Sequence, residues 1–144
     1  MSSVAGELLL DTGALVSLLD RGQAHHAACR RVYEEWAGSV VSTEAVLTEA
    51  THLLGRIDGG VAACLDFFLM GGAVLVPSSV VSLKRARALI VKYAHQPMDF
   101  ADATLVALGE ELGTSTVFTT DRTDFAIYRL KDRRPFKILP ESPG

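Results

Sequence analysis

The sequence predicts an α/β fold, a single domain over residues 1–144 with a mainly parallel five-stranded sheet between helices. Short apolar runs of strand length alternate with longer stretches of helical pattern along the whole chain. Two of these runs, residues 7–10 and 116–119, lead into acidic residues, Asp11 and Asp121. Such a run is typical of a buried parallel strand whose carboxyl end presents a carboxylate. We therefore expect the two acids to meet at one edge of the sheet, where α/β proteins bind ligands.

The first half of the chain is predicted to combine two short strands with four helices. Gly38 ends the second helix, Ser42 or Thr43 caps the third, and Gly55 follows it. The strands are expected at 7–10 and 39–42, and the helices at 12–19, 24–36, 43–54 and 61–70.

The second half is predicted to add three strands and three helices. Pro77 ends a strand, Ser78 or Ser79 caps the helix after it, and Asp99 caps the next. The strands are expected at 73–76, 116–119 and 136–139, and the helices at 79–93, at 99–112 and, as a short one, from about Phe125.

Composition argues against several classes of function. The net charge of −3 provides no overall basic field for nucleic acid. Cys29 and Cys64 lack CxxC spacing, so we expect buried core residues rather than zinc ligands. The most apolar segment, 61–70, is too short to span a bilayer, and no signal-peptide pattern precedes Asp11. We therefore expect a soluble, cytoplasmic protein. The sequence has no glycine motif of the nucleotide-binding kinds.

Helical-wheel positions single out two further acids. Glu49 lies on the flank of an apolar stripe that includes Val46 and Leu53, so its carboxylate can reach a crevice while the helix stays packed. Asp102 has a similar flank position, beside the stripe that contains Leu105. The alternative for Glu49 is an ordinary residue at the boundary between core and solvent.

Three acids have a plausible role as helix caps. Asp11 precedes the first helix, and its alternative role is only to cap that helix. Asp99 fits the cap position ahead of Asp102, which favours Asp102 as the chemical residue. Asp124 is expected either to cap the short helix at Phe125 or to act as a further ligand.

Asp11, Glu49, Asp102 and Asp121 together predict a site for a divalent cation. Carboxylates that share one crevice repel by ~3 kcal/mol per close pair at an effective dielectric constant of about 20. A hard cation relieves this repulsion, and Mg²⁺ or Mn²⁺ prefers all-oxygen ligands. No His or Cys has a metal-like spacing to these acids, which favours metal-assisted phosphoryl chemistry over zinc hydrolysis.

The chain resembles PIN-domain proteins, and most closely the VapC-like toxin ribonucleases, in four stretches: LLLDTGAL, STEAVLTEATHLL, MDFADATLVALGEELG and FTTDRTDFAIYRL. The resemblance extends from Leu8 to about Pro140. It implies a five-stranded parallel sheet, an acidic cluster that holds Mg²⁺ or Mn²⁺, and cleavage of single-stranded RNA. It also implies which residues form the site: the four acids Asp11, Glu49, Asp102 and Asp121, and the hydroxyl residues Thr12 and Thr119 beside the first and fourth of them.

Basic and apolar segments suggest where partners bind. The stretch 122–137 has a local excess of +4 and could contact RNA phosphates, as could the cluster around Lys84; a solvated face is the alternative for both. The candidate RNA-binding residues are Arg122, Arg129, Arg133 and Arg134. Scattered tyrosines give no support for base stacking. The apolar helix 61–70 belongs to the core, to a homodimer interface or to a groove for a small antitoxin protein.

Three other functions are consistent with parts of this pattern. A haloacid-dehalogenase-like phosphatase also begins with a strand that ends in Asp, but it needs a second Asp where this chain has Gly13. A phosphoacceptor receiver domain needs a Lys after the last acidic strand, and none is placed there. A non-catalytic PIN-like module that binds RNA or protein is the remaining alternative, and the intact acid set argues against it.

Overall fold

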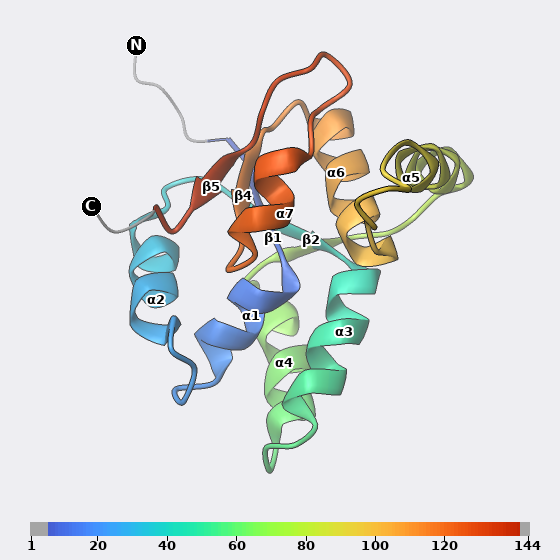
Figure 1. Cartoon of the computed structure of the whole chain (residues 1–144). Helices are drawn as coiled ribbons and strands as arrows, with labels where there is room; N and C mark the ends of the chain where they lie inside the picture. Colours follow the sequence, from blue (N-terminus) through green and yellow to red (C-terminus); the bar gives the residue numbers. More distant parts are fainter. Residues whose placement is uncertain (1–5, 142–144) are drawn as a thin grey trace.

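The computed structural model describes residues 6–141 and contains one five-stranded sheet with the strand order β3-β2-β1-β4-β5 (Figure 1). All four strand pairings are parallel, which confirms the predicted fold class. Each strand begins within one residue of its predicted start. The strands are β1 (Leu8–Leu10), β2 (Val40–Thr43), β3 (Val74–Val76), β4 (Thr116–Phe118) and β5 (Lys137–Leu139).

Helices connect the strands and cover the sheet (Figure 1). They are α1 (Thr12–Leu19), α2 (His26–Glu35), α3 (Glu44–Leu54), α4 (Gly60–Leu69), α5 (Val80–Lys92), α6 (Phe100–Leu112) and α7 (Arg122–Ile127). None of the helices in residues 6–141 is long and apolar enough to cross a membrane. Cys29 and Cys64 are both fully buried, as predicted for core residues.

Helix α6 lies at the centre of the packing, against β1, β2, α3 and α5. Its residues from Ala101 to Gly109 are all buried, so Asp102 is buried too and does not lie on an open flank. Close approach to the sheet explains Gly109, because a Cβ atom there would lie 2.9 Å from the carbonyl oxygen of Thr114 and 3.0 Å from Leu9 Cδ1. Helix α6 is thus held between the sheet, α3 and α5.

Two sequence predictions need correction. Helix α7 begins at Arg122 and not at Phe125, and the residue that caps it is Asp121, whose side chain accepts a hydrogen bond from the Asp124 amide. Leu53 is 43% exposed although it lies on the predicted apolar stripe of α3. The apolar segment 61–70, expected in the core or in a protein interface, buries Cys64 but exposes Leu65, Leu69 and Met70, so the core alone does not account for it.

Candidate metal centre

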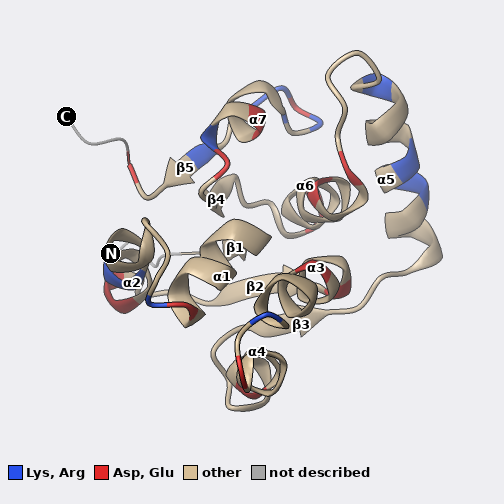
Figure 2. Cartoon of the chain, turned by 60° about the horizontal axis from the view of Figure 1, so that its bottom comes forward, with Lys and Arg blue, Asp and Glu red and all other residues tan. Residues whose placement is uncertain are grey.

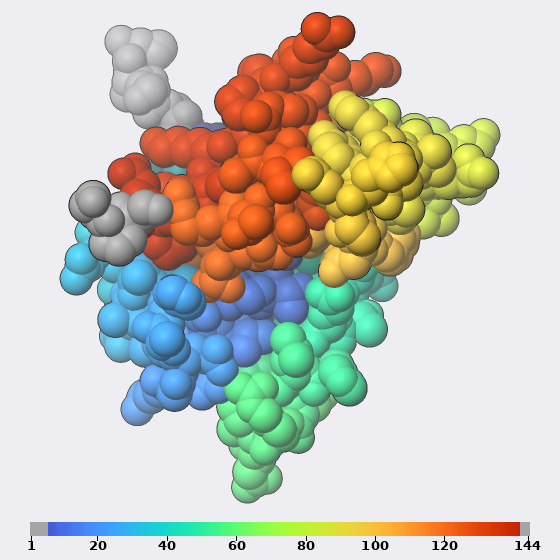
Figure 3. All heavy atoms as spheres, viewed as in Figure 1, coloured from blue at the N-terminus to red at the C-terminus, as the bar shows by residue number. Residues whose placement is uncertain are grey.

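The carboxyl ends of β1 and β4 bring the first and last acidic motifs together. The two strands pair in parallel, and the Asp11 amide donates to the Phe118 carbonyl at 2.9 Å. The chain leaves the sheet at this edge into α1 on one side and α7 on the other. In the space-filling view the surfaces of α1 (blue), α3 (teal) and the segment around α7 (orange) meet in the middle of the molecule (Figure 3).

Three carboxylates converge at this edge: Asp102, Asp121 and Asp124 each offer an oxygen, and these oxygens lie within 4.8 Å of one another. Asp121 and Asp124 come from the start of α7, and Asp102 comes from the first turn of α6. Within residues 6–141 none of these acids forms an ion pair with a Lys, Arg or His side chain. Their negative charge is therefore not compensated by a nearby basic side chain.

Asp11 is adjacent to this group and is held by Thr119. The Thr119 hydroxyl donates to Asp11 Oδ2 at 2.6 Å and accepts a bond from the Asp121 amide at 2.9 Å. Asp11 occupies the cap position of α1, but its side chain accepts no capping hydrogen bond. Burial raises the pKa of Asp11 to about 6, although the Thr119 hydrogen bond opposes the shift. The geometry thus disfavours the simple capping role.

Asp102 is the most strongly perturbed acid of the site. Burial, followed by the charges of Asp11 and Asp99, raises its pKa to about 8, while a hydrogen bond from Tyr128 opposes this shift. The Tyr128 hydroxyl donates to Asp102 Oδ2 at 2.9 Å. Asp99 caps α6 as expected, since its Oδ1 accepts from the Asp102 amide at 2.8 Å. A hydrogen bond shared with Asp121 raises the pKa of Asp124.

Glu49 comes from α3 and lies outside the group of three converging carboxylates. Its Oε1 accepts a hydrogen bond from the Thr12 hydroxyl at 2.9 Å, across a separation of 37 residues. Thr12 follows Asp11 directly, so Glu49 is tied to the end of β1. Glu44 is exposed, as the helical wheel predicts, but Glu49 is exposed as well, so the predicted contrast between the two residues is not observed.

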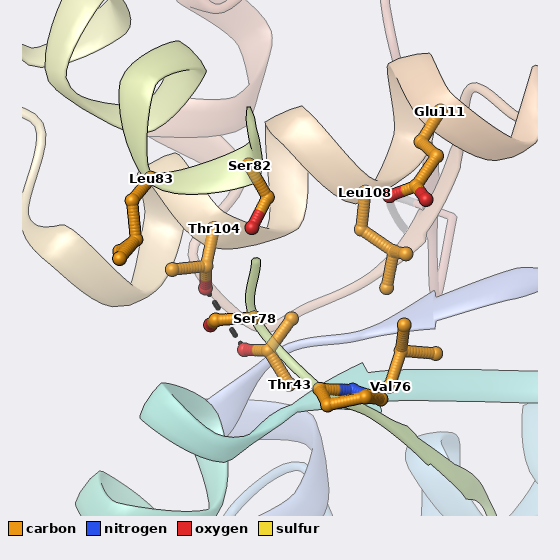
Figure 4. A pocket seen from close by; sticks show the side chains of 9 residues that line it. Thr43, Val76, Ser78, Ser82, Leu83, Thr104, Leu108 and Glu111 are labelled. Carbon is orange, nitrogen blue, oxygen red and sulfur yellow. Dashed lines mark hydrogen bonds between the residues drawn. The ribbon is translucent and has the colours of Figure 1, made fainter. Parts of the chain in front are cut away.

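A buried hydroxyl pair fixes α3 relative to α6 (Figure 4). The Thr43 and Thr104 hydroxyl oxygens lie 2.8 Å apart, and Thr104 donates to the Ala101 carbonyl at 2.7 Å. Thr104 therefore accepts its other bond from Thr43, the residue that caps α3. These two residues also line a small cavity of about 20 Å³, enough for one water molecule. Glu49, in the middle of α3, and Asp102, in the first turn of α6, thus belong to two helices that are bonded to each other.

The candidate RNA-binding arginines do not form one patch. Arg122 is next to the acids, and its guanidinium donates to the Pro140 carbonyl. Arg129 donates to three carbonyls at the end of α7. Arg133 and Arg134 lie in the loop after α7, which rises away from the carboxyl edge (Figure 1), and Arg134 pairs with Asp132 at 2.7 Å. Further basic side chains follow the length of α5 (Figure 2).

The donor set fits a hard divalent cation. The converging atoms are carboxylate oxygens, and no Cys or His belongs to the cluster found in the described part of the chain. Oxygen-only ligation is the preference of Mg²⁺ and Mn²⁺. Burial and, after it, the charges of neighbouring acids raise the pKa values of Asp11 and Asp102, and a cation bound here would offset the repulsion between these acids.

Tyr128 is the residue of the site that sequence reasoning missed. It is 1% exposed, and its ring packs edge-to-face against Tyr93 and Phe125. Only the fold brings it to Asp102, which is 26 residues away in the chain. Within its own segment nothing distinguishes it from an ordinary core aromatic residue, so no local pattern could have found it.

We expect Tyr128→Phe to weaken metal binding by roughly 10- to 100-fold, the usual cost of losing an outer partner of a metal ligand. The change removes the hydroxyl that orients Asp102 and leaves a buried carboxylate oxygen without its donor. The measurement is the Mn²⁺ concentration that produces half of the full metal-induced rise in melting temperature. Tyr93→Phe is the matched control, because it removes a half-buried hydroxyl that accepts from the Arg129 amide and does not contact Asp102. If Tyr128→Phe and wild type need the same Mn²⁺ concentration for half of this rise, Tyr128 does not orient a metal ligand.

Comparison with known proteins identifies the family of the chain. The family model described as the PIN domain matches residues 8–131. Ribonuclease VapC26 of Mycobacterium tuberculosis is 28% identical over 137 residues, which cover 92% of this chain and all of that protein.

Three solved structures share the fold. Mycobacterium tuberculosis VapC20, described as a toxin that cleaves the sarcin-ricin loop, superposes with a TM-score of 0.75 at 22% identity, over 81% of this chain and 91% of its own. VapBC2 of Rickettsia felis, bound to a promoter DNA fragment, superposes with a TM-score of 0.66 at 12% identity, over 92% of this chain and 98% of its own. A toxin–antitoxin complex from Klebsiella pneumoniae superposes with a TM-score of 0.63 at 17% identity, over 83% of this chain and 90% of the matched chain. Because the family model spans most of its length, the chain belongs to the PIN-domain family.

Proposed function

We propose that this chain is an endoribonuclease that uses Mg²⁺ or Mn²⁺ to cleave single-stranded RNA, and that it is the toxin of a toxin–antitoxin pair. The observation that carries the proposal is the convergence of Asp102, Asp121 and Asp124 within 4.8 Å without a basic partner in residues 6–141. The name of its relative Ribonuclease VapC26 supports the choice of RNA.

The side chains divide into ligands and residues that orient them. The proposed ligands are Asp11, Glu49, Asp102 and Asp121, to which proximity adds Asp124. Thr119, Thr12 and Tyr128 each donate a hydrogen bond to one of these carboxylates and so fix its direction. A bound ion would supply the Lewis acidity that favours deprotonation of water and stabilises charge on the phosphate. A carboxylate of the set accepts the proton of the attacking water, whose oxygen displaces the leaving oxygen from phosphorus.

RNA cleavage by the purified chain tests this function. Wild-type protein should cut a single-stranded RNA in Mg²⁺ or Mn²⁺ and should stop cutting when EDTA is added. Asp11→Asn keeps the size of the side chain and an oxygen for the Thr119 hydrogen bond, yet it should be inactive. A wild-type protein that binds RNA but never cleaves it in either metal would indicate the non-catalytic module instead.

Replacing Arg133 and Arg134 by Ala should weaken RNA binding and flatten its salt dependence. We assign to these arginines contacts with the phosphates of an RNA strand that runs from the acids over α7. The slope of log binding constant against log salt concentration should then fall by roughly 0.7 per lost contact on a single strand. The chemical rate at saturating RNA should hardly change, because such a contact is equal in the ground and transition states. Fluorescence anisotropy at several salt concentrations measures the slope.

The control for this prediction is the double replacement of Lys84 and Arg87 by Ala, on the basic face of α5. Their neighbour Arg85 is unsuitable, since it forms a two-pronged ion pair with Glu110. An effect of the control pair alone would mean that RNA approaches over α5 and that the arginines of the loop are merely solvated.

Exposed apolar residues provide surfaces for the proposed protein partners. Leu69 and Met70 at the end of α4 are 81% and 86% exposed, and Val74 on the edge strand β3 is 57% exposed. We assign this face to a homodimer or to an antitoxin, and the second partner is supported by the fold shared with VapBC2 and with the Klebsiella toxin–antitoxin complex. Sedimentation of the purified chain, with Leu69→Ser beside wild type, tests the homodimer: equal monomeric mass in both would exclude this face as its interface.

A further inference from the structure

A cavity of about 300 Å³ opens between the starts of α3 and α6. It is lined by Ala45, Thr48, Glu49, Phe100 and Ala101. In Figure 1 the first turns of these two helices face each other beside the edge at which β1 runs into α1. The cavity is therefore next to the proposed metal centre, with which it shares the Glu49 side chain.

Phe100 is the feature of this cavity that needs an explanation. It is 48% exposed, and it is the only exposed aromatic residue in the described part of the chain. The packing of α6 does not require it, because Met98, two residues earlier, is 5% exposed and contributes to the core at this end of the helix. An aromatic ring that is left open beside a polar site is suited to contact a ligand.

The neighbours of Phe100 place it close to the proposed reaction. Asp99, directly before it, caps α6 through the Asp102 amide. Glu49, across the cavity, is held by Thr12 at the end of β1. An RNA strand whose phosphate lies at the carboxylates would therefore have an adjacent nucleotide within reach of the Phe100 ring.

We propose that this cavity binds an unpaired nucleobase next to the cleaved phosphate, stacked on Phe100. The inference rests on the proposed ribonuclease function and adds a subsite to it. The cavity offers an aromatic face and the small apolar side chains of Ala45 and Ala101, which accept the flat surface of any base. A base inside a duplex cannot splay out in this way, so the subsite selects single-stranded RNA.

The test combines a change in the protein with a change in the RNA. Phe100→Ala should raise the Kd for a short single-stranded RNA roughly 5- to 150-fold, the range expected from a loss of one stacked base. Phe100→Trp should restore binding, because the indole offers a larger aromatic face. Leu112→Ala is the matched control, since Leu112 is 37% exposed at the other end of the same helix.

A series of RNAs in which one base at a time is replaced by an abasic sugar locates the subsite. Wild-type protein should bind more weakly to the RNA whose abasic sugar lies at one position beside the cleavage site. Phe100→Ala should bind this abasic RNA as tightly as it binds the intact RNA. The two losses are then not additive, as expected for groups in direct contact.

Additive losses, or an unchanged Kd in Phe100→Ala, would overturn the subsite even if the enzyme remains active. Self-association that Phe100→Ala abolishes, with unchanged RNA binding, would also overturn it and would assign Phe100 to a protein interface. RNA binding is measured by fluorescence anisotropy, and RNA cleavage is measured in parallel. Wild-type protein that never cleaves would refute the ribonuclease function. The anisotropy series would still decide whether the subsite exists.

Discussion

Asp102→Asn should reduce RNA cleavage at least about 100-fold, because loss of even an outer partner of a metal ligand often costs roughly 10- to 100-fold. The fold should survive, since an asparagine oxygen can still accept the hydrogen bond from the Tyr128 hydroxyl. The variant should in fact be more stable than wild type at pH 8 without metal, because it removes a buried carboxylate whose charged form is disfavoured. Its melting temperature should no longer respond to metal.

The matched variant for this prediction is Asp99→Asn. Asp99 is exposed and caps α6, and asparagine caps a helix about as well as aspartate does. We therefore expect Asp99→Asn to retain most of the cleavage activity and its response to metal. Equal loss in the two variants would mean that Asp99 is itself a ligand, and full activity in Asp102→Asn would remove Asp102 from the site.

Without metal, the protein should lose stability as the pH rises from about 4 to about 8. The pKa values of Asp11 and Asp102 in the folded state are about 6 and about 8, both above the ordinary 3.8. The folded state thus binds these protons more tightly than the unfolded state does. The stability that they contribute is complete below the ordinary pKa and is lost as pH rises through the folded-state values.

Mg²⁺ or Mn²⁺ should reverse much of this loss. At a free metal concentration about 100 times Kd, an ion that binds only the folded state adds ~2.7 kcal/mol, or roughly 5–10 °C in the melting temperature. The gain should be larger at pH 8 than at pH 5, where protons compete for the carboxylates. Melts in metal and in EDTA across this range measure it, with Asp66→Asn on the exposed face of α4 as control. Identical midpoints with and without millimolar metal would count strongly against the cluster.

The strands and the ends of most helices could be read from the sequence because their signals are local. An apolar run that is bounded by glycine, proline or an acid is visible without knowledge of its neighbours, as in Leu8–Leu10. The start of α7 was misplaced because Asp121 and Asp124 are both good caps, and only the path of the chain after β4 decides between them. Leu53 shows the same limit, since periodicity does not tell how far a covering layer extends.

Of the four acids that the sequence predicts, Asp102 and Asp121 converge in the structure together with Asp124, whose role the sequence leaves open. Asp102 was placed on a helix flank, and it is buried because α6 is covered by the sheet, α3 and α5 at once. The Tyr128 hydroxyl and the Phe100 ring acquire their positions from contacts between distant elements. In sequence both resemble ordinary apolar positions of a helix, which is why neither was singled out.

A crystal structure with Mn²⁺, located by its anomalous scattering, tests the central claim most directly. We predict one or two peaks at the carboxyl ends of β1 and β4, with oxygens of Asp102 and Asp121 as ligands and Asp124 or Asp11 completing the set. The same crystals of Asp121→Asn should show a weaker peak or none. The claim would be contradicted by wild-type crystals in saturating Mn²⁺ that show no peak among these carboxylates, or a peak only elsewhere on the surface.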